Sequence, residues 1–127
     1  MNRVITFTDH GPCGPDQRRE QAAARAMRRY IPHVVAWQCA GASAPIAVTL
    51  PETLSVRDLL RRAERERVRV DPVHDPAAPD RVFHIHYAHL AEAEIEEGIR
   101  RLGRCLQQYA KVAASVAAGE SHAFVGT

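Results

Sequence analysis

The spacing of apolar and polar residues near the start of the chain predicts one short strand and one amphipathic helix. Residues 3–8 alternate as in a strand, and the segment 10–15 is so rich in Gly and Pro that we expect a loop. Asp16 is a suitable N-cap for a helix that ends before Pro32. Its apolar residues recur at three- and four-residue spacing: Ala22, Ala23, Ala26, Met27 and Tyr30.

The middle of the chain predicts a hairpin followed by a second helix. Residues 34–38 and 46–50 have the composition of strands and are joined by small residues, so we expect them to pair. Ser55 followed by Asp58 is typical of a helix start. The apolar stripe of this helix consists of Val56, Leu59, Leu60 and Ala63, and a short strand at 68–70 follows.

The last third of the chain predicts a loop, a strand and the clearest helix. Three prolines interrupt residues 71–80, which we expect to be irregular, before a strand at 81–87. The final helix has acidic residues in its first turns and arginines later, as the helix dipole favours. Its buried stripe is Ile95, Ile99, Leu102, Leu106 and Tyr109, and the tail from Ala110 onward is expected to fray.

Composition is that of one globular domain. The chain has 127 residues, of which 46% are hydrophobic and 25% charged, enough for a single core. We therefore treat 1–127 as one domain, with an arm at 1–15, a core at 16–109 and a tail at 110–127.

Charge and hydropathy exclude several classes of function. The net charge of +2 provides no field that would attract nucleic acid or an anionic membrane. No apolar run approaches the ~20 residues of a membrane span, and the first residues do not have the composition of a signal peptide. Three widely spaced cysteines are expected to be reduced thiols. These features predict a cytoplasmic protein without nucleic-acid or membrane partners.

The order of elements predicts an α/β fold, a small open sheet with its helices on one face. Four segments then become familiar in this order: Met27-Arg28-Arg29-Tyr30-Ile31-Pro32, Val48-Thr49-Leu50-Pro51, Val68-Arg69-Val70-Asp71-Pro72, and Tyr87-Ala88-His89-Leu90 through Glu94-Ile95-Glu96-Glu97-Gly98-Ile99-Arg100-Arg101-Leu102. Together they resemble the small C-terminal domain of fold-type-I pyridoxal-phosphate-dependent aminotransferases, particularly the branch fused to winged-helix regulators. The resemblance covers about residues 17–109.

The chain departs from that family in its cofactor site. The resemblance implies a large domain that supplies the Schiff-base lysine, a phosphate cup and a stacking aromatic ring, and this sequence contains no such domain and no winged helix. Its sole lysine is Lys111, beyond the matched region. We therefore expect no cofactor, and no transaminase activity by the chain alone.

A second departure concerns the substrate site. The family carries a carboxylate-binding arginine in its last strand, in a pattern like R-L-S-F-A, and this chain has His84-Ile85-His86-Tyr87-Ala88 there. His84 stands at the arginine position. Because strand side chains alternate, His84 and His86 share one face, and the apolar residues between them face the helices.

Three interpretations of the histidine pair are open. Two imidazoles on one face can act as general acid and base, since imidazole titrates near neutral pH. They can also bind a metal, with His74 as a third ligand, although no carboxylate lies nearby in sequence. In the third interpretation they are ordinary polar residues on the exposed face of a sheet.

Other candidate residues have equally open roles. Trp37, the sole tryptophan, is a core residue or, if it shares the histidine face, a platform for a planar substrate. Arg81 is a solvated strand end or a replacement for the lost carboxylate clamp. His10 and Cys13 could form a base and nucleophile in a flexible loop. The arginines between 61 and 69 alternate with glutamates, which is typical of a solvated helix face.

The combined pattern predicts a cofactor-independent biosynthetic enzyme for a small organic substrate. His84 and His86 would be its acid and base in a condensation, cyclisation or isomerisation, with His74, Trp37 and Arg81 binding the substrate. The alternative is a non-catalytic subunit that docks on a partner through the same sheet face. A catalytic face should be a concave polar pocket, whereas a docking face should be flat and apolar. We also expect a homo-oligomer that covers the exposed sheet, with the strand at 3–8 added to its own or a neighbour's sheet.

Overall fold

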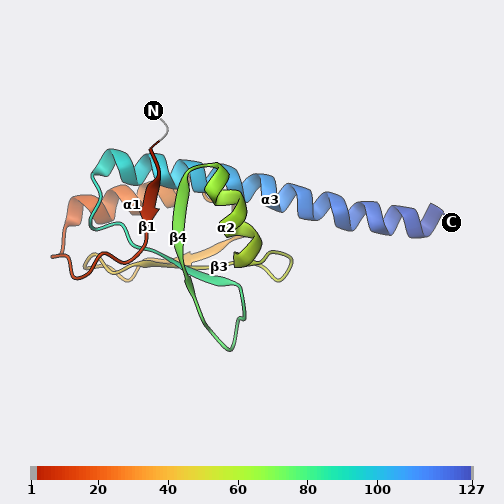
Figure 1. Ribbon diagram of the computed structural model, residues 1–127, viewed down its shortest axis with the longest axis horizontal. Helices are drawn as coiled ribbons and strands as arrows, with labels where there is room; N and C mark the ends of the chain where they lie inside the picture. The colour runs from red at the N-terminus through yellow and green to blue at the C-terminus, as the bar shows by residue number, and fades with distance from the viewer. Residues whose placement is uncertain (1–2, 127) are drawn as a thin grey trace.

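The computed structural model describes the backbone of residues 3–126 and the side chains up to Val116. Five strands and three helices follow one another in these residues (Figure 1): β1 (Ile5–Phe7), α1 (Gln17–Tyr30), β2 (Ala36–Gln38), β3 (Ile46–Thr49), α2 (Val56–Arg65), β4 (Val68–Val73), β5 (Val82–Ile85) and α3 (Glu92–Gly126). The predicted α/β fold class is confirmed.

The strands form one mixed sheet in the order β1-β4-β5-β3-β2. β2 and β3 pair as the antiparallel hairpin that the sequence predicted, and β3 also pairs with β5. The first half of β4 pairs in parallel with β1, and its second half pairs antiparallel with β5. The sheet therefore brings the N-terminal arm beside strands from the second half of the chain.

Side-chain caps fix the starts of the first two helices where the sequence placed them. The Asp16 carboxylate accepts hydrogen bonds from the backbone N–H groups of Arg18 and Arg19, at 3.0 and 3.2 Å. The Ser55 hydroxyl accepts one from the N–H of Asp58 at 3.2 Å. Each bond satisfies a donor that the helix itself leaves unpaired.

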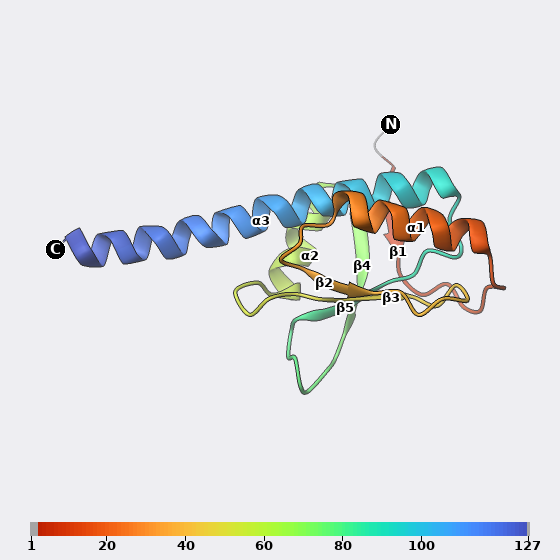
Figure 2. The same cartoon turned by 180° about the vertical axis from the view of Figure 1, so that it is seen from behind.

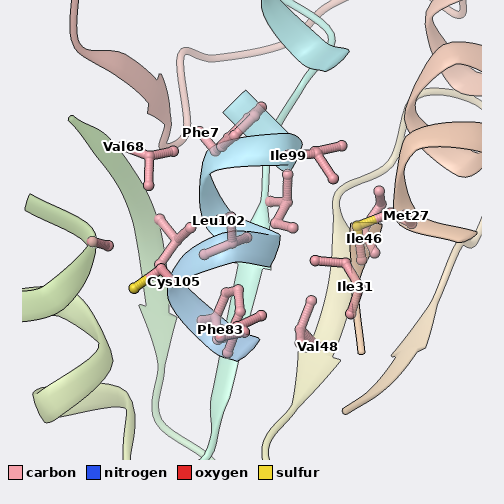
Figure 3. Close-up of a cluster of buried hydrophobic side chains, with 14 of the residues drawn as sticks. Phe7, Met27, Ile31, Ile46, Val48, Val68, Phe83, Ile99, Leu102 and Cys105 are labelled. Carbon is pink, nitrogen blue, oxygen red and sulfur yellow. The ribbon is translucent and has the colours of Figure 1, made fainter. Parts of the chain in front are cut away.

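All three helices contribute to one hydrophobic core on one face of the sheet. α1 and α3 lie side by side over the strands, and Figure 2 shows the same layering from behind. α3 crosses the middle of the sheet, where Leu102 and Ile99 pack among residues of β1, β3, β4 and β5 (Figure 3). Phe83 and Ile85 of β5 are fully buried there, while His84 between them is half-buried on the opposite face.

Two predicted segments differ from the structure. Residues 71–73 belong to β4 instead of the loop, because Pro72 occupies a position where its missing N–H does not stop pairing of Asp71 and Val73 with β5. The tail expected to fray continues α3 to Gly126, past the end of the sheet, and Figure 1 shows it projecting from the body. Residues 110–118 contain no Pro and are rich in Ala, the strongest helix former. Thr127 lies outside the described residues.

The strand predicted at 3–8 is present as β1 within the chain's own sheet. No helix in residues 3–126 is both long enough and apolar enough to cross a membrane.

Candidate functional site

The sheet face turned away from the helices carries a histidine pair and a carboxylate. His84 of β5 stands opposite Asp71 of β4 in the antiparallel register, so the two side chains share this face. His86 follows directly after β5, and its backbone N–H donates to the carbonyl oxygen of Phe7 at 2.9 Å. The C-terminal ends of β1 and β5 thus meet at His86, beside the middle of β4.

The central contact of the site joins His86 to Asp71. The His86 Nε2 lies 3.0 Å from the Asp71 Oδ2. The imidazole is 20% exposed and the carboxylate 38%, so the pair is accessible from solvent without being fully hydrated. The His84 ring lies edge-on to the His86 ring, with 5.9 Å between the ring centroids. A proton can therefore pass to or from either imidazole at the same surface.

His86 also lines a pocket of about 350 Å³. The walls of this pocket, which we call the histidine pocket, are the loop 9–13, the loop 42–45 and the segment 86–89. Within it the His10 and His89 rings stack, with centroids 3.8 Å apart and an angle of 14° between the planes. The pocket is concave, and both polar and apolar atoms line it, as in many small-molecule sites.

Backbone carbonyls of the arm orient the stacked rings. The His89 Nε2 lies 2.8 Å from the Thr6 carbonyl oxygen, and the His10 Nδ1 lies 2.9 Å from the Thr8 carbonyl oxygen. Burial, and then the charges that His10 and His86 can carry, lower the pKa of His89 from its ordinary value, although the bond to Thr6 opposes this shift. His89 is therefore held neutral in neutral solution and donates a fixed hydrogen bond to the arm.

The structure separates Trp37 from the histidines. In the strand register Trp37 pairs with Val48, and Val48 pairs with Phe83, so all three side chains face the helices. Trp37 is partly buried against the core. Trp37 would stack on a substrate only from the histidine face, and it does not lie on that face.

Arg81 and His74 lie at the other end of β5 and β4. Arg81 precedes β5, five residues from His86, which corresponds to about 16 Å along an extended strand. Its guanidinium contacts the carbonyl oxygen of Leu50. His74 follows β4 and is exposed. Neither residue lines the histidine pocket.

The donor groups do not make a metal centre. In the part of the chain that the structure describes, no three His, Cys, Asp or Glu side chains are arranged to hold a metal ion. The thiol of Cys13 contacts the carbonyl oxygen of Gly11, while His10 bonds to Thr8 and stacks on His89, so the two are not arranged as nucleophile and base.

Sequence reasoning missed Asp71 and did not connect His10 with the other histidines of this site. The sequence assigned Asp71 to a loop. In the structure Asp71 lies across the sheet from the histidine pair and supplies the carboxylate that is missing near the pair in sequence. The spacing of His84, His86 and His89 within six positions was a usable signal for a histidine cluster. His10, which stacks on His89, comes from the N-terminal arm, and only the pairing of β1 brings it to this site.

No protein-family model and no curated protein matches the chain. Solved structures do match. The α-aminoadipate aminotransferase LysN of Thermus thermophilus is 31% identical with a TM-score of 0.68, over 74% of this chain and 25% of LysN. The multiple substrate aminotransferase of Thermococcus profundus is 26% identical with a TM-score of 0.66, over 73% and 24%.

A third match is the kynurenine aminotransferase of Pyrococcus horikoshii, 25% identical with a TM-score of 0.62, over 71% of this chain and 23% of that enzyme. The chain thus spans about a quarter of the length of each enzyme. The aminotransferase motifs and the structural matches agree: the chain has the fold of the small domain of fold-type-I pyridoxal-phosphate-dependent aminotransferases.

Proposed function

We propose that the protein is a cofactor-independent enzyme that binds a small organic substrate in the histidine pocket and transfers protons with His84 and His86. The observation that carries this proposal is the 3.0 Å contact between the Asp71 Oδ2 and the Nε2 of His86, which lines the histidine pocket. His84 and Asp71 are not among the residues that line this pocket. A carboxylate bound to one nitrogen of an imidazole fixes its tautomer and orientation, which is what a general base requires.

The residues of this chain do not fit pyridoxal phosphate, the cofactor that the fold family implies. An aldimine needs a lysine amine beside the substrate site, and the sole lysine, Lys111, is exposed on α3 in the helical layer. It borders a different surface hollow, together with Arg62 and Val112. The mechanism therefore contains no step through this cofactor.

The geometry supports the following proton transfer. With its ring proton on Nε2, His86 donates to Asp71 and presents the lone pair of Nδ1. That nitrogen takes a proton from a carbon next to a substrate carbonyl, and the electron pair stays on the substrate as an enolate. Protonated His84 returns a proton at the new position, and solvent restores both imidazoles. Isomerisation, cyclisation and aldol-type condensation can all begin with the formation of such an enolate.

Deuterium exchange tests the proposal without a known substrate. A panel of small keto acids and aldehydes is incubated with the protein in D₂O, and the loss of carbon-bound hydrogen is followed by ¹H NMR. We expect faster exchange for at least one compound, reduced about a hundredfold or more in His86→Gln. His33→Gln, an exposed histidine in the turn after α1, is the matched control and should retain the rate. Exchange that is absent, or equal in both variants, would contradict the proposal.

Asp71 is a positioning residue in this mechanism, and a double variant tests it. Asp71→Asn should slow exchange in the wild-type background and have no further effect when His86 is already Gln, because the carboxylate acts through that imidazole. Additive losses would mean that Asp71 has an independent structural role.

One observation favours a non-catalytic alternative. The matched enzymes are about four times as long as the aligned part, so this chain corresponds to one domain of a larger enzyme. Its half-buried sheet face is a surface that such an enzyme could cover. In this second candidate function the chain docks on a separate large domain through that face. Ala47→Glu, at the β3 position paired with His84, would then abolish a complex seen by size-exclusion chromatography with a purified large domain.

A further inference from the structure

A second hollow, which lies between α1 and the β2–β3 loop, is lined by two arginines and by one carboxylate, that of Glu20. This α1 groove has a volume of about 580 Å³ and shares only Tyr87 with the histidine pocket. Arg25 and Arg28 line it from one face of α1, three residues apart. In the described residues neither guanidinium forms an ion pair, although eight other pairs are present.

The shape of the groove leaves room above the two arginines. The residues between α1 and the loop are small, Ala24 on the helix and Ala40 and Gly41 on the loop. Gly41 has a φ of +82°, a conformation that side chains other than glycine rarely adopt. The loop is fixed against α1 because the backbone N–H of Ser43 donates to the Glu20 carboxylate. The groove is thus a built feature of the fold.

Tyr87 supplies an unused donor at the inner wall. Tyr87 is only 3% exposed, and it lines the α1 groove. No hydrogen bond forms to its hydroxyl within residues 3–116, and no fully buried side-chain N or O atom in that part of the chain lacks a partner. The hydroxyl therefore keeps some accessible surface, and Tyr87 lines both the α1 groove and the histidine pocket. Burial first, and then the negative charge of Glu20, raise the pKa of Tyr87 to about 12, so the phenol remains a donor at neutral pH.

From these three donors we infer that the α1 groove binds a small oxyanion, a carboxylate or a phosphate group, between Arg25, Arg28 and Tyr87. Guanidinium groups bind planar or tetrahedral oxyanions through paired N–H donors, and a buried phenol adds a directed hydrogen bond. Glu20 also lines the groove, and its carboxylate accepts from the backbone N–H of Ser43. One negative charge therefore stands against two guanidinium groups, and the groove keeps a net positive charge that favours an anion.

The test compares two double variants of the same helix by NMR. Inorganic phosphate and acetate are titrated separately into ¹⁵N-labelled protein in a non-binding buffer, and amide shifts are followed. We expect saturable shifts at Gly41, Tyr87 and the middle of α1 with at least one of the two anions, and the preferred anion identifies the ligand class. Arg25→Gln with Arg28→Gln should weaken this binding at least tenfold.

The matched control is Arg18→Gln with Arg29→Gln, which removes the same charge from α1 outside the groove. It should retain the affinity within about twofold, since screened charges at a distance contribute little. Tyr87→Phe keeps the buried ring and should weaken binding about three- to tenfold through the lost hydrogen bond. Dispersed amide spectra confirm that each variant is folded. No saturable shifts in the wild type, or equal losses in the two double variants, would overturn the inference.

Discussion

The contact between α1 and α3 permits a stringent test of the fold at Gly103. A Cβ added at this buried glycine would lie 2.4 Å from the carbonyl oxygen of Tyr30 and 2.9 Å from its carbonyl carbon. Side-chain carbons essentially never approach other atoms closer than 3.0 Å, and here the obstacle is the backbone at the end of α1. The two helices would have to separate locally, because neither Tyr30 nor Gly103 can move alone.

The magnitude follows from two opposing effects. Replacing Gly by Ala inside a helix contributes about 1 kcal/mol of stability through reduced backbone entropy. Overpacking typically costs about 1–3 kcal/mol, and an obstacle made of rigid backbone places this site at about 3 kcal/mol. We therefore expect Gly103→Ala to lower the free energy of unfolding by about 2 kcal/mol, which corresponds to a Tm lower by about 8 °C for a chain of this size.

Urea unfolding followed by circular dichroism and by Trp37 fluorescence measures this change. Gly14→Ala is the matched control, because nothing lies within 4 Å of its added Cβ and its φ is not positive. That variant should be neutral or slightly more stable. If Gly103→Ala unfolds at the same urea concentration as the wild type or later, the two helices do not pack as closely as the structure has them.

Three further predictions concern a cap, an acidic group and the cofactor. Ser55→Ala removes the N-cap of α2 and should cost about 1 kcal/mol in urea unfolding, whereas an unchanged midpoint would mean that the cap contributes nothing. Hydrogen bonds from Arg100 and then Arg101 lower the pKa of Glu97 to about 2, so its stabilisation is complete above its ordinary pKa of 4.5 and is lost as the pH falls from there toward 2. Because Glu97 is partly exposed, Glu97→Gln should lower stability by no more than about 1 kcal/mol at pH 7, and the difference from wild type should vanish near pH 2. Pyridoxal phosphate should give no adduct that borohydride traps, and a trapped adduct at Lys111 seen by mass spectrometry would contradict our interpretation of the cofactor.

The sequence predicted most elements because their local signals agree with their packing. Asp16 and Ser55 cap helices as expected, and the stripe from Ile95 to Tyr109 is buried in the core. The tail was different, since its weak apolar pattern said nothing about α3 continuing to Gly126. Helix propensity acts residue by residue, and an Ala-rich segment without Pro favours the continuation of a helix that has already formed.

The candidate site was predictable only in part, for a physical reason. The alternation of β5 placed His84 and His86 on one face, and their half-buried positions agree with that expectation. Asp71 could not be connected to them, because which residues of β4 and β5 face each other depends on strand register. Trp37 was ambiguous for the same reason, since its face is set by pairing with Val48.

The fold determines where a site can lie on this chain, and the side chains determine its chemistry. In the aminotransferase pattern, the position of His84 carries an arginine, a permanent cation suited to a substrate carboxylate. An imidazole there can both give and accept a proton. Asp71, directly opposite in the sheet, would be a counter-ion for an arginine, but here its carboxylate holds His86 instead. In the proposed function, the same strand pairing serves proton transfer where an arginine would bind a negative charge. The exchange rate of His86→Gln is therefore a more direct test of that proposal than ligand affinity.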